Sequence, residues 1–163
     1  MASNAIEKAK ELREEGNRLF KAGEVRKALA EYHQIYMYVH GYKVKGGDSS
    51  SALGALTGSR SDGSEASAEE MGELNELKLV HYSNVGLCHF KLGNYDKCVQ
   101  YCTKALAMDP KSVKLLYRRG KSHMELGNID SAQEDLQHAR KLDPSNRDVV
   151  AALHALKPLL KAQ

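Results

Sequence analysis

Apolar side chains recur at helical spacing along most of the chain. They fall into three groups: Leu12, Leu19 and Phe20, then Tyr82, Val85 and Phe90, then Leu116 and Met124. Within each group the later positions lie three, seven or eight residues after the first, and residues at these separations share one face of an α-helix. Polar and charged residues occupy most positions between them. The pattern predicts an all-α fold of amphipathic helices.

The helical pattern repeats with a fixed period. Residues 83–110 align with residues 117–144 without a gap, so that Gly86 returns 34 residues later as Gly120. The other matched positions are Gly93 with Gly127, Ala105 with Ala139, and Asp109-Pro110 with Asp143-Pro144. The N-terminal segment fits the same template through Gly16, Gly23, Ala28 and Tyr32. Small, aromatic and proline positions at constant offsets over this period are typical of stacked helix-turn-helix units, so we predict three repeats.

These features resemble the tetratricopeptide repeat family. The resemblance implies a right-handed superhelix of three helical hairpins followed by a C-terminal capping helix. We expect repeat 1 at residues 9–42, repeat 2 at 79–112, repeat 3 at 113–146 and the capping helix at 146–161, within one domain of residues 1–163. In the last helix, Ser145 or Asn146 is expected to cap the start and Pro158 to kink or end it. Its inner face is expected to comprise Val149, Val150, Leu153 and Leu156.

An insertion separates the first two repeats. Gly16 and Gly86 are 70 residues apart, 36 more than one period, and residues 41–69 contain six glycines and seven serines. Such a composition buries too little apolar surface to offset the entropy of ordering, so a flexible segment is expected over residues 43–69. Either a regulatory, phosphorylated segment or a tolerated spacer fits this composition. Long helices joined by such a loop resemble the repeat domains of FKBP-type immunophilin cochaperones and small stand-alone proteins of the family.

Composition and charge indicate a cellular compartment but no particular partner. The 24 basic and 21 acidic residues give a formal charge of +3, which requires neither nucleic acid nor a membrane. There is no apolar run of the roughly 18 residues that a membrane span needs, and the N-terminal residues are charged. The three cysteines follow no disulfide framework. We therefore expect a monomeric protein of the reducing cytoplasm.

Charged and amide side chains gather on the first helices of the repeats. Lys114 and Arg118 are four residues apart and share one helix face, as do Arg13 and Asn17. Asn84 lies one period before Arg118. Since first helices line the concave face of such a stack, these side chains are expected to face one groove. Guanidinium, ammonium and carboxamide groups together suit the end of a peptide that carries two carboxylates.

The same five positions resemble the two-carboxylate clamp of cochaperone repeat domains. There, Lys-x-x-x-Asn, Asn and Lys-x-x-x-Arg on successive first helices bind the C-terminal aspartate of heat-shock chaperones that end in EEVD. The resemblance implies that Arg13, Asn17, Asn84, Lys114 and Arg118 bind the tail of a chaperone of the ninety- or seventy-kilodalton class. Arg13 departs from the pattern, because it stands in the lysine position and has a different reach. Phe20 and Lys121 are expected to add secondary peptide contacts, although core packing and solvent exposure are the competing interpretations.

Other functions find less support in the residues. Cys98 and Cys102 have a spacing that some metal sites use, yet they occupy the packing positions of Ala132 and Leu136, so buried thiols are favoured and no metal is expected. Nucleic-acid binding ranks third, because the basic run at 111–121 has no basic flank. Without a phosphate-binding loop, a GxSxG or an HExxH motif, no enzyme activity, catalytic residue or cofactor is expected. The serious alternative is a scaffold that holds another protein through its convex face, its second helix or the inserted segment.

Overall fold

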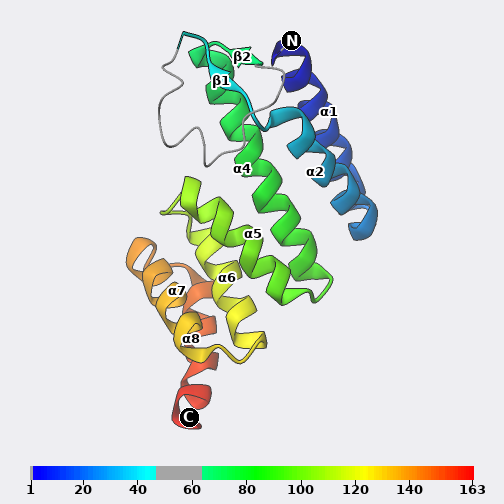
Figure 1. The fold of residues 1–163 in the computed structure, drawn as a ribbon. Helices are drawn as coiled ribbons and strands as arrows, with labels where there is room; N and C mark the ends of the chain where they lie inside the picture. The colour runs from blue at the N-terminus through cyan, green and yellow to red at the C-terminus, as the bar shows by residue number, and fades with distance from the viewer. Residues whose placement is uncertain (1, 47–63) are drawn as a thin grey trace. The chain divides into compact units, whose positions relative to one another are not determined.

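The computed structural model describes residues 2–46 and 64–163 (Figure 1). The helices are α1 (Ala2–Lys21), α2 (Val25–Val39), α4 (Ala68–Lys91), α5 (Tyr95–Met108), α6 (Val113–Glu125), α7 (Ile129–Leu142) and α8 (Arg147–Lys161). Two short strands, β1 (Lys43–Val44) and β2 (Glu65–Ala66), are the other elements of these residues. The predicted all-α class is confirmed. None of the described helices combines the length and apolar character needed to cross a membrane.

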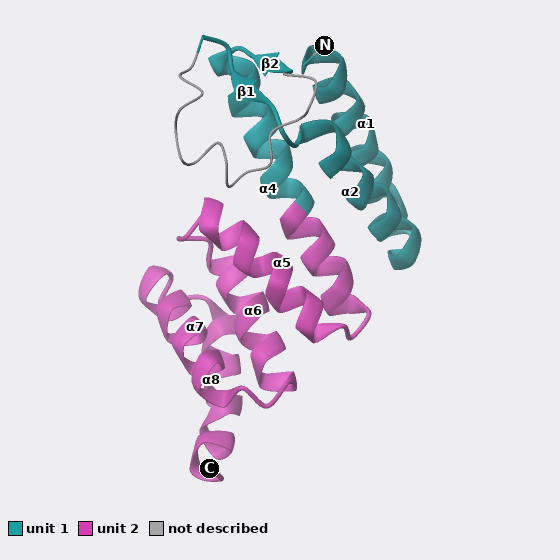
Figure 2. Ribbon diagram, in the orientation of Figure 1, with its two compact units in different colours: residues 1–81 teal, residues 82–163 magenta. Residues whose placement is uncertain are grey.

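The chain divides into two compact units, and the division falls inside α4 (Figure 2). Residues 1–81 form unit 1, which contains α1, α2, the two strands and the first part of α4. Residues 82–163 form unit 2, which contains the rest of α4 and the helices α5 to α8. The first expected repeat therefore lies in unit 1 and the third in unit 2.

In unit 1, α1 packs against α2 at a glycine. A Cβ atom added at Gly16 would lie 2.5 Å from Cε1 of Tyr32, so any larger residue there would displace the tyrosine ring. The buried residues Ala9, Ala28 and Ile35 continue this interface. On the other side of α2, Nδ1 of His81 in α4 lies 2.8 Å from the main-chain oxygen of Tyr32. The pairing of Gly16 with a large aromatic thus sets how closely the first hairpin closes.

In unit 2 the same contact recurs with smaller partners. A Cβ atom at Gly120 of α6 would lie 2.8 Å from Cγ of Leu136 in α7, and one at Gly86 of α4 would lie 3.3 Å from Sγ of Cys102 in α5. The core of α7 and α8 is a cluster of Ile129, Ala132, Leu136, Ala152 and Leu156. Burying aliphatic side chains of this size contributes about 1.5 to 3 kcal/mol each, which makes α8 an integral cover of the third hairpin.

The start of α8 matches the prediction and its remainder departs from it. Asn146 caps the helix, because its side chain accepts a hydrogen bond from the Val149 amide. Val150 was expected on the inner face but is 47% exposed, and Ala152 is buried instead. Pro158 was expected to kink or end the helix, yet α8 continues past it to Lys161. Pro158 removes the N–H that would bond to the main-chain oxygen of His154, yet the helix goes on for a further turn, in which the Ala162 amide bonds to the Pro158 oxygen.

The two ends of the expected flexible segment are ordered. β1 pairs with β2 in parallel, Lys43 opposite Glu65 and Val44 opposite Ala66. Next to β2, the Ser67 hydroxyl accepts a hydrogen bond from the Glu70 amide, and the Glu70 carboxylate accepts one from the Ser67 amide. This reciprocal capping box starts α4 at Ala68. The rest of the expected segment, residues 47–63, lies outside the described residues.

Candidate peptide-binding site

Arg13 is an unneutralised cation on α1. Three other basic residues of this helix have carboxylate partners, in the pairs Lys8–Glu11, Lys10–Glu73 and Arg18–Glu15. No ion pair involves Arg13 within residues 2–46 and 64–163, although four glutamates lie on the same helix. The guanidinium of Arg13 therefore has no carboxylate counter-ion among the described residues.

Asn17 lies one turn after Arg13, and its side chain is held by α2. The hydroxyl of Tyr32 donates a hydrogen bond to Oδ1 of Asn17 over 2.6 Å. The carboxamide oxygen is thus engaged within unit 1, while Nδ2 retains its two N–H donors. Phe20, the expected secondary contact, lies in the last turn of α1 and is half-buried.

In unit 2, α6 carries Lys114 and Arg118, one turn apart. Ser112 caps this helix by accepting a hydrogen bond from the Leu115 amide, which places Lys114 in the first helical turn. The partial positive charge of a helix N-terminus adds to that of the ammonium group, and both attract anions. Burial, and then the charge of Arg118, lower the pKa of Lys114. No carboxylate pairs with Lys114 or Arg118 in the part of the chain that the structure describes.

Arg118 differs from the expectation that it opens into a groove. Only 5% of this residue is exposed, and its Nη1 donates a hydrogen bond of 2.9 Å to the main-chain oxygen of Ser83 in α4. Among the described residues the Arg118 guanidinium forms no ion pair. It also hydrogen-bonds Cys102, an interaction that acts to lower the pKa of that thiol. The contact with Ser83 brings Arg118 beside the residue that precedes Asn84. The Asn84 carboxamide is half-buried and has no hydrogen-bond partner among the described residues.

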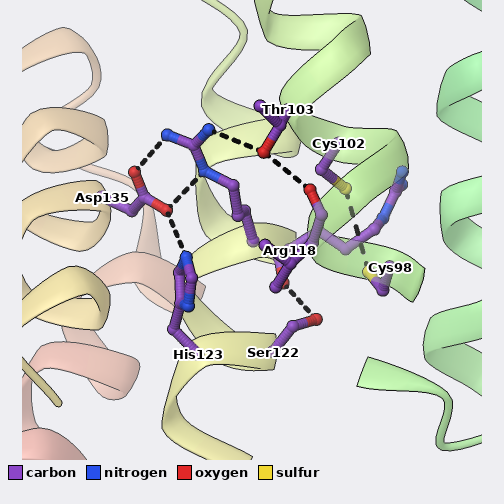
Figure 3. Close-up of polar contacts among 9 residues, drawn as sticks. Cys98, Cys102, Thr103, Arg118, Ser122, His123 and Asp135 are labelled. Carbon is purple, nitrogen blue, oxygen red and sulfur yellow. Dashed lines mark hydrogen bonds and ion pairs between the residues drawn. The ribbon is translucent and has the colours of Figure 1, made fainter. Parts of the chain in front are cut away.

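Arg119 and Asp135 form a buried ion pair that the sequence did not reveal. Nε and Nη2 of Arg119 each lie 2.7 Å from an oxygen of Asp135, and Nη1 donates to the Thr103 hydroxyl over 3.2 Å. In Figure 3, Asp135 lies to the left of Thr103 and His123 lies below Asp135. Nε2 of His123 is 4.0 Å from Oδ2 of Asp135. The hydrogen bond to Asp135 raises the pKa of Arg119. Arg119 therefore ties α5, α6 and α7 together and is not available to a ligand.

Lys121, the other expected secondary contact, is half-buried and has no carboxylate partner among the described residues.

The three cysteines lie in unit 2, and the charge of Arg118 acts to lower the pKa of each thiol. Cys98 and Cys102 are fully buried with 3.8 Å between their sulfur atoms, and Cys88 is also buried (Figure 3). Burial raises the pKa of Cys88 to about 11. Hydrogen bonding between Cys98 and Cys102 lowers the pKa of the first and raises that of the second. The described residues contain no group of three or more histidine, cysteine, aspartate or glutamate side chains able to hold a metal ion.

The structure brings together the predicted site residues within each unit. Arg13 and Asn17 lie one turn apart in unit 1, and Asn84, Lys114 and Arg118 lie on the neighbouring helices α4 and α6 of unit 2. Every one of these residues lies on the first helix of a repeat, as the sequence predicts.

Comparison with known proteins identifies the repeats. Residues 81–112 and 113–146 each match a family model described as tetratricopeptide repeat. The chain is 29% identical over 146 residues to the mouse peptidyl-prolyl cis-trans isomerase FKBP4, which covers 90% of this chain and 27% of the mouse protein. It is 34% identical over 89 residues to FK506-binding protein 59 of Drosophila melanogaster, covering 55% of this chain and 20% of that protein. The chain thus spans about a quarter or less of the length of these curated relatives.

Solved structures share the fold at lower identity. The C-terminal TPR-containing domain of a Plasmodium falciparum FK506-binding protein superimposes with a TM-score of 0.80 at 23% identity, covering 99% of this chain and 94% of that one. The first TPR of Spaghetti (RPAP3), bound to the HSP90 peptide SRMEEVD, gives 0.68 at 19% identity over 95% of this chain and 94% of that one. UNC-45 of C. elegans, in complex with a Hsp90 peptide, gives 0.64 at 26% identity over 94% of this chain and 13% of that one.

Proposed function

We propose that this chain, a member of the tetratricopeptide repeat family, binds the acidic C-terminal tail of a heat-shock chaperone through a clamp for two carboxylates. The repeat fold is a protein-interaction fold, and a cochaperone or adaptor role in the reducing cytoplasm follows from such a ligand. The tail is of the EEVD type and comes from a chaperone of the ninety- or seventy-kilodalton class.

The observation that carries the proposal is a set of cations, Arg13, Lys114 and Arg118, that have no counter-ion among residues 2–46 and 64–163. Lys114 and Arg118 are like charges one turn apart, and the charge of Arg118 contributes to the lowered pKa of Lys114. Like charges at this spacing destabilise a helix, so retaining them without a nearby carboxylate favours an anionic ligand. Arg13 likewise has no carboxylate partner among the described residues, whereas Lys8, Lys10 and Arg18 of the same helix have one. A carboxylate entering from another protein would relieve the repulsion on α6.

The donors match the chemistry of a chain end. The C-terminal residue of an EEVD tail offers a main-chain and a side-chain carboxylate, both of which are acceptor-only groups. The ammonium of Lys114 and the remaining donors of Arg118 supply charge-assisted hydrogen bonds, and the carboxamides of Asn84 and Asn17 supply neutral ones. Arg13 adds a guanidinium in place of the usual lysine.

The similar structures support the same ligand class. RPAP3 and UNC-45 are solved with Hsp90 peptides, and one of these peptides ends in EEVD. Yeast Cns1, described as an Hsp90 co-chaperone, also shares the fold, with a TM-score of 0.69. The FKBP4 relatives are named as isomerases, but the matched part is 27% of the mouse protein, and we propose no reaction for this chain.

A scaffold function for a different partner remains the second proposal. Met37, on the second helix of the first repeat, is 68% exposed, which is the highest exposed fraction among the large apolar residues that the structure describes. An exposed methionine on a helix is a common feature of adaptable protein-binding surfaces. A partner held there would be indifferent to charge changes on α6.

Isothermal titration calorimetry with a chaperone C-terminal peptide tests the clamp. We expect a dissociation constant in the micromolar range, which corresponds to a binding free energy of about 8 kcal/mol. The affinity is no higher because ordering the flexible tail offsets part of the charge-assisted bonding. The same peptide amidated at its C-terminus loses one carboxylate and is expected to bind at least tenfold more weakly. Equal affinity of the two peptides would refute the clamp.

A further inference from the structure

We propose that Tyr32 is a positioning residue that orients the Asn17 carboxamide so that it selects a free carboxylate at the end of the peptide. The inference deepens the proposed function and rests on it, since it assigns to Tyr32 a role in the specificity of the same site. Tyr32 itself is 3% exposed and would make no contact with the ligand.

The orientation follows from the direction of one hydrogen bond. The Tyr32 hydroxyl donates to Oδ1 of Asn17 over 2.6 Å, and the carboxamide oxygen is the atom that would repel an incoming carboxylate. With that oxygen engaged, Asn17 offers its Nδ2 donors to the ligand. A carboxylate only accepts hydrogen bonds, whereas a terminal amide also donates, so an asparagine free to flip would serve both ends.

Tyr32 is held both at its ring and at its main chain. At Gly16 the absence of a Cβ atom lets the ring lie against α1, since a Cβ atom would come within 2.5 Å of it. At the other end, His81 of α4 contacts the main-chain oxygen of Tyr32 at 2.8 Å. Gly16 directly precedes Asn17, so the same glycine that admits the ring also brings the hydroxyl to the neighbouring side chain.

Comparison among the repeats separates this role from packing. Gly16, Gly86 and Gly120 occupy the same position in the three repeats. The residue 16 positions later is Tyr32 in repeat 1, Cys102 in repeat 2 and Leu136 in repeat 3. The residue directly after that glycine is Asn17 in repeat 1, Leu87 in repeat 2 and Lys121 in repeat 3. A thiol and an isobutyl group fill the packing position without a hydroxyl. Of the three repeats, only the one with the asparagine has the tyrosine.

The test is Tyr32→Phe, which removes the hydroxyl and keeps the ring on Gly16. Tyr38→Phe is the matched control, because Tyr38 is half-buried on the same helix and takes no part in the bond to Asn17. Calorimetry is run on each variant of the 163-residue chain with the free-acid and the amidated chaperone peptide. We expect Tyr32→Phe to weaken binding of the free acid about three- to tenfold and to leave the amidated peptide nearly unchanged. Tyr38→Phe is expected to match the wild type for both peptides.

A double-mutant cycle distinguishes positioning from a general loss of structure. In an Asn17→Ala background, adding Tyr32→Phe is expected to cause no further loss of affinity, because the oriented group is already gone. An equal loss in both backgrounds would overturn the positioning role. Unchanged selectivity of Tyr32→Phe, in a protein whose wild type prefers the free acid, would overturn it and leave the proposed function intact. A wild type without that preference would overturn both.

Discussion

The first helices of repeats 1 and 3 handle positive charge in different ways. On α1, Lys8 and Arg18 pair with glutamates three residues away, and the side chains of both pairs are exposed. On α6, Arg119 reaches across to Asp135 of α7, and the pair is largely enclosed, with side chains 23% and 9% exposed. Exposed pairs within a helix contribute little to stability, whereas breaking an enclosed pair leaves a charge without its partner. The comparison separates ion pairs at the surface of one helix from an ion pair that joins two helices.

The glycine contacts of the two repeats differ as well. In repeat 1 the partner of Gly16 is a tyrosine ring whose hydroxyl bonds to Asn17, and in repeat 3 the partner of Gly120 is an aliphatic leucine. The same position of the template can therefore serve packing in one repeat, and packing together with side-chain orientation in another.

The largest expected effect comes from breaking the enclosed ion pair. Asp135→Ala leaves the Arg119 guanidinium without its two hydrogen bonds and is expected to lower the free energy of unfolding by about 3 to 5 kcal/mol. Glu15→Ala, which removes the partner of Arg18 on α1, is expected to change it by about 0.5 kcal/mol or less. Chemical denaturation of both variants measures the difference. Similar losses for the two would remove the distinction between the helices.

Charge reversal on α6 is expected to act on binding rather than on folding. Lys114→Glu replaces a repelled lysine with a glutamate four residues before Arg118, which is expected to raise helix stability by a few tenths of a kcal/mol. The same change is expected to reduce the affinity for the chaperone peptide by at least tenfold, through the loss of a charge-assisted hydrogen bond and the repulsion of a carboxylate.

Lys111→Glu is the matched control for charge. Lys111 is exposed and lies before the cap of α6, so its reversal changes the net charge equally without altering the proposed site. Equal weakening by both variants in calorimetry would indicate general electrostatic attraction. Retention of a partner by Lys114→Glu would favour the scaffold function.

Alanine at the glycine contacts is expected to show which repeat tolerates a methyl group. Gly16→Ala places Cβ 2.5 Å from the Tyr32 ring and is expected to destabilise unit 1 by at least about 1 kcal/mol. Gly120→Ala meets the Leu136 side chain at 2.8 Å and is expected to cost less, since a leucine can change rotamer. Thermal unfolding compares them, and a smaller loss for Gly16→Ala would contradict the fixed ring.

The smallest effect has the opposite sign. Gly72 lies inside α4 with no heavy atom within 4 Å of an added Cβ atom. Gly72→Ala is expected to stabilise the protein by about 0.5 to 1 kcal/mol, because alanine loses less backbone entropy in a helix. An unfolding midpoint below that of the wild type would contradict this assignment.

The period of 34 residues was sufficient to predict the helices of the repeats and their order, because these depend on local spacing. It also placed the proposed site residues on the first helices. The capping prediction for Asn146 is confirmed, since a cap is a local hydrogen bond.

The repeat pattern did not predict the side-chain interactions between helices. Arg119 and Asp135 are 16 residues apart, and repeat 2 has Val85 and Tyr101 at the same offsets, so the period itself gave no signal for the pair. The burial of Arg118 depends on a main-chain oxygen of another helix, which a residue pattern does not encode. The exposure of Val150 and the pairing of β1 with β2 likewise depend on tertiary contacts.

A crystal structure of the chain with a free-acid EEVD peptide would test the central claim most directly, through the distances from Lys114 and Arg118 to the terminal residue of the peptide. The account predicts a peptide carboxylate oxygen about 2.7 to 2.9 Å from Nζ of Lys114, with Arg118 bound to a carboxylate of the same residue. A peptide seated elsewhere, with both cations still facing no carboxylate, would contradict it.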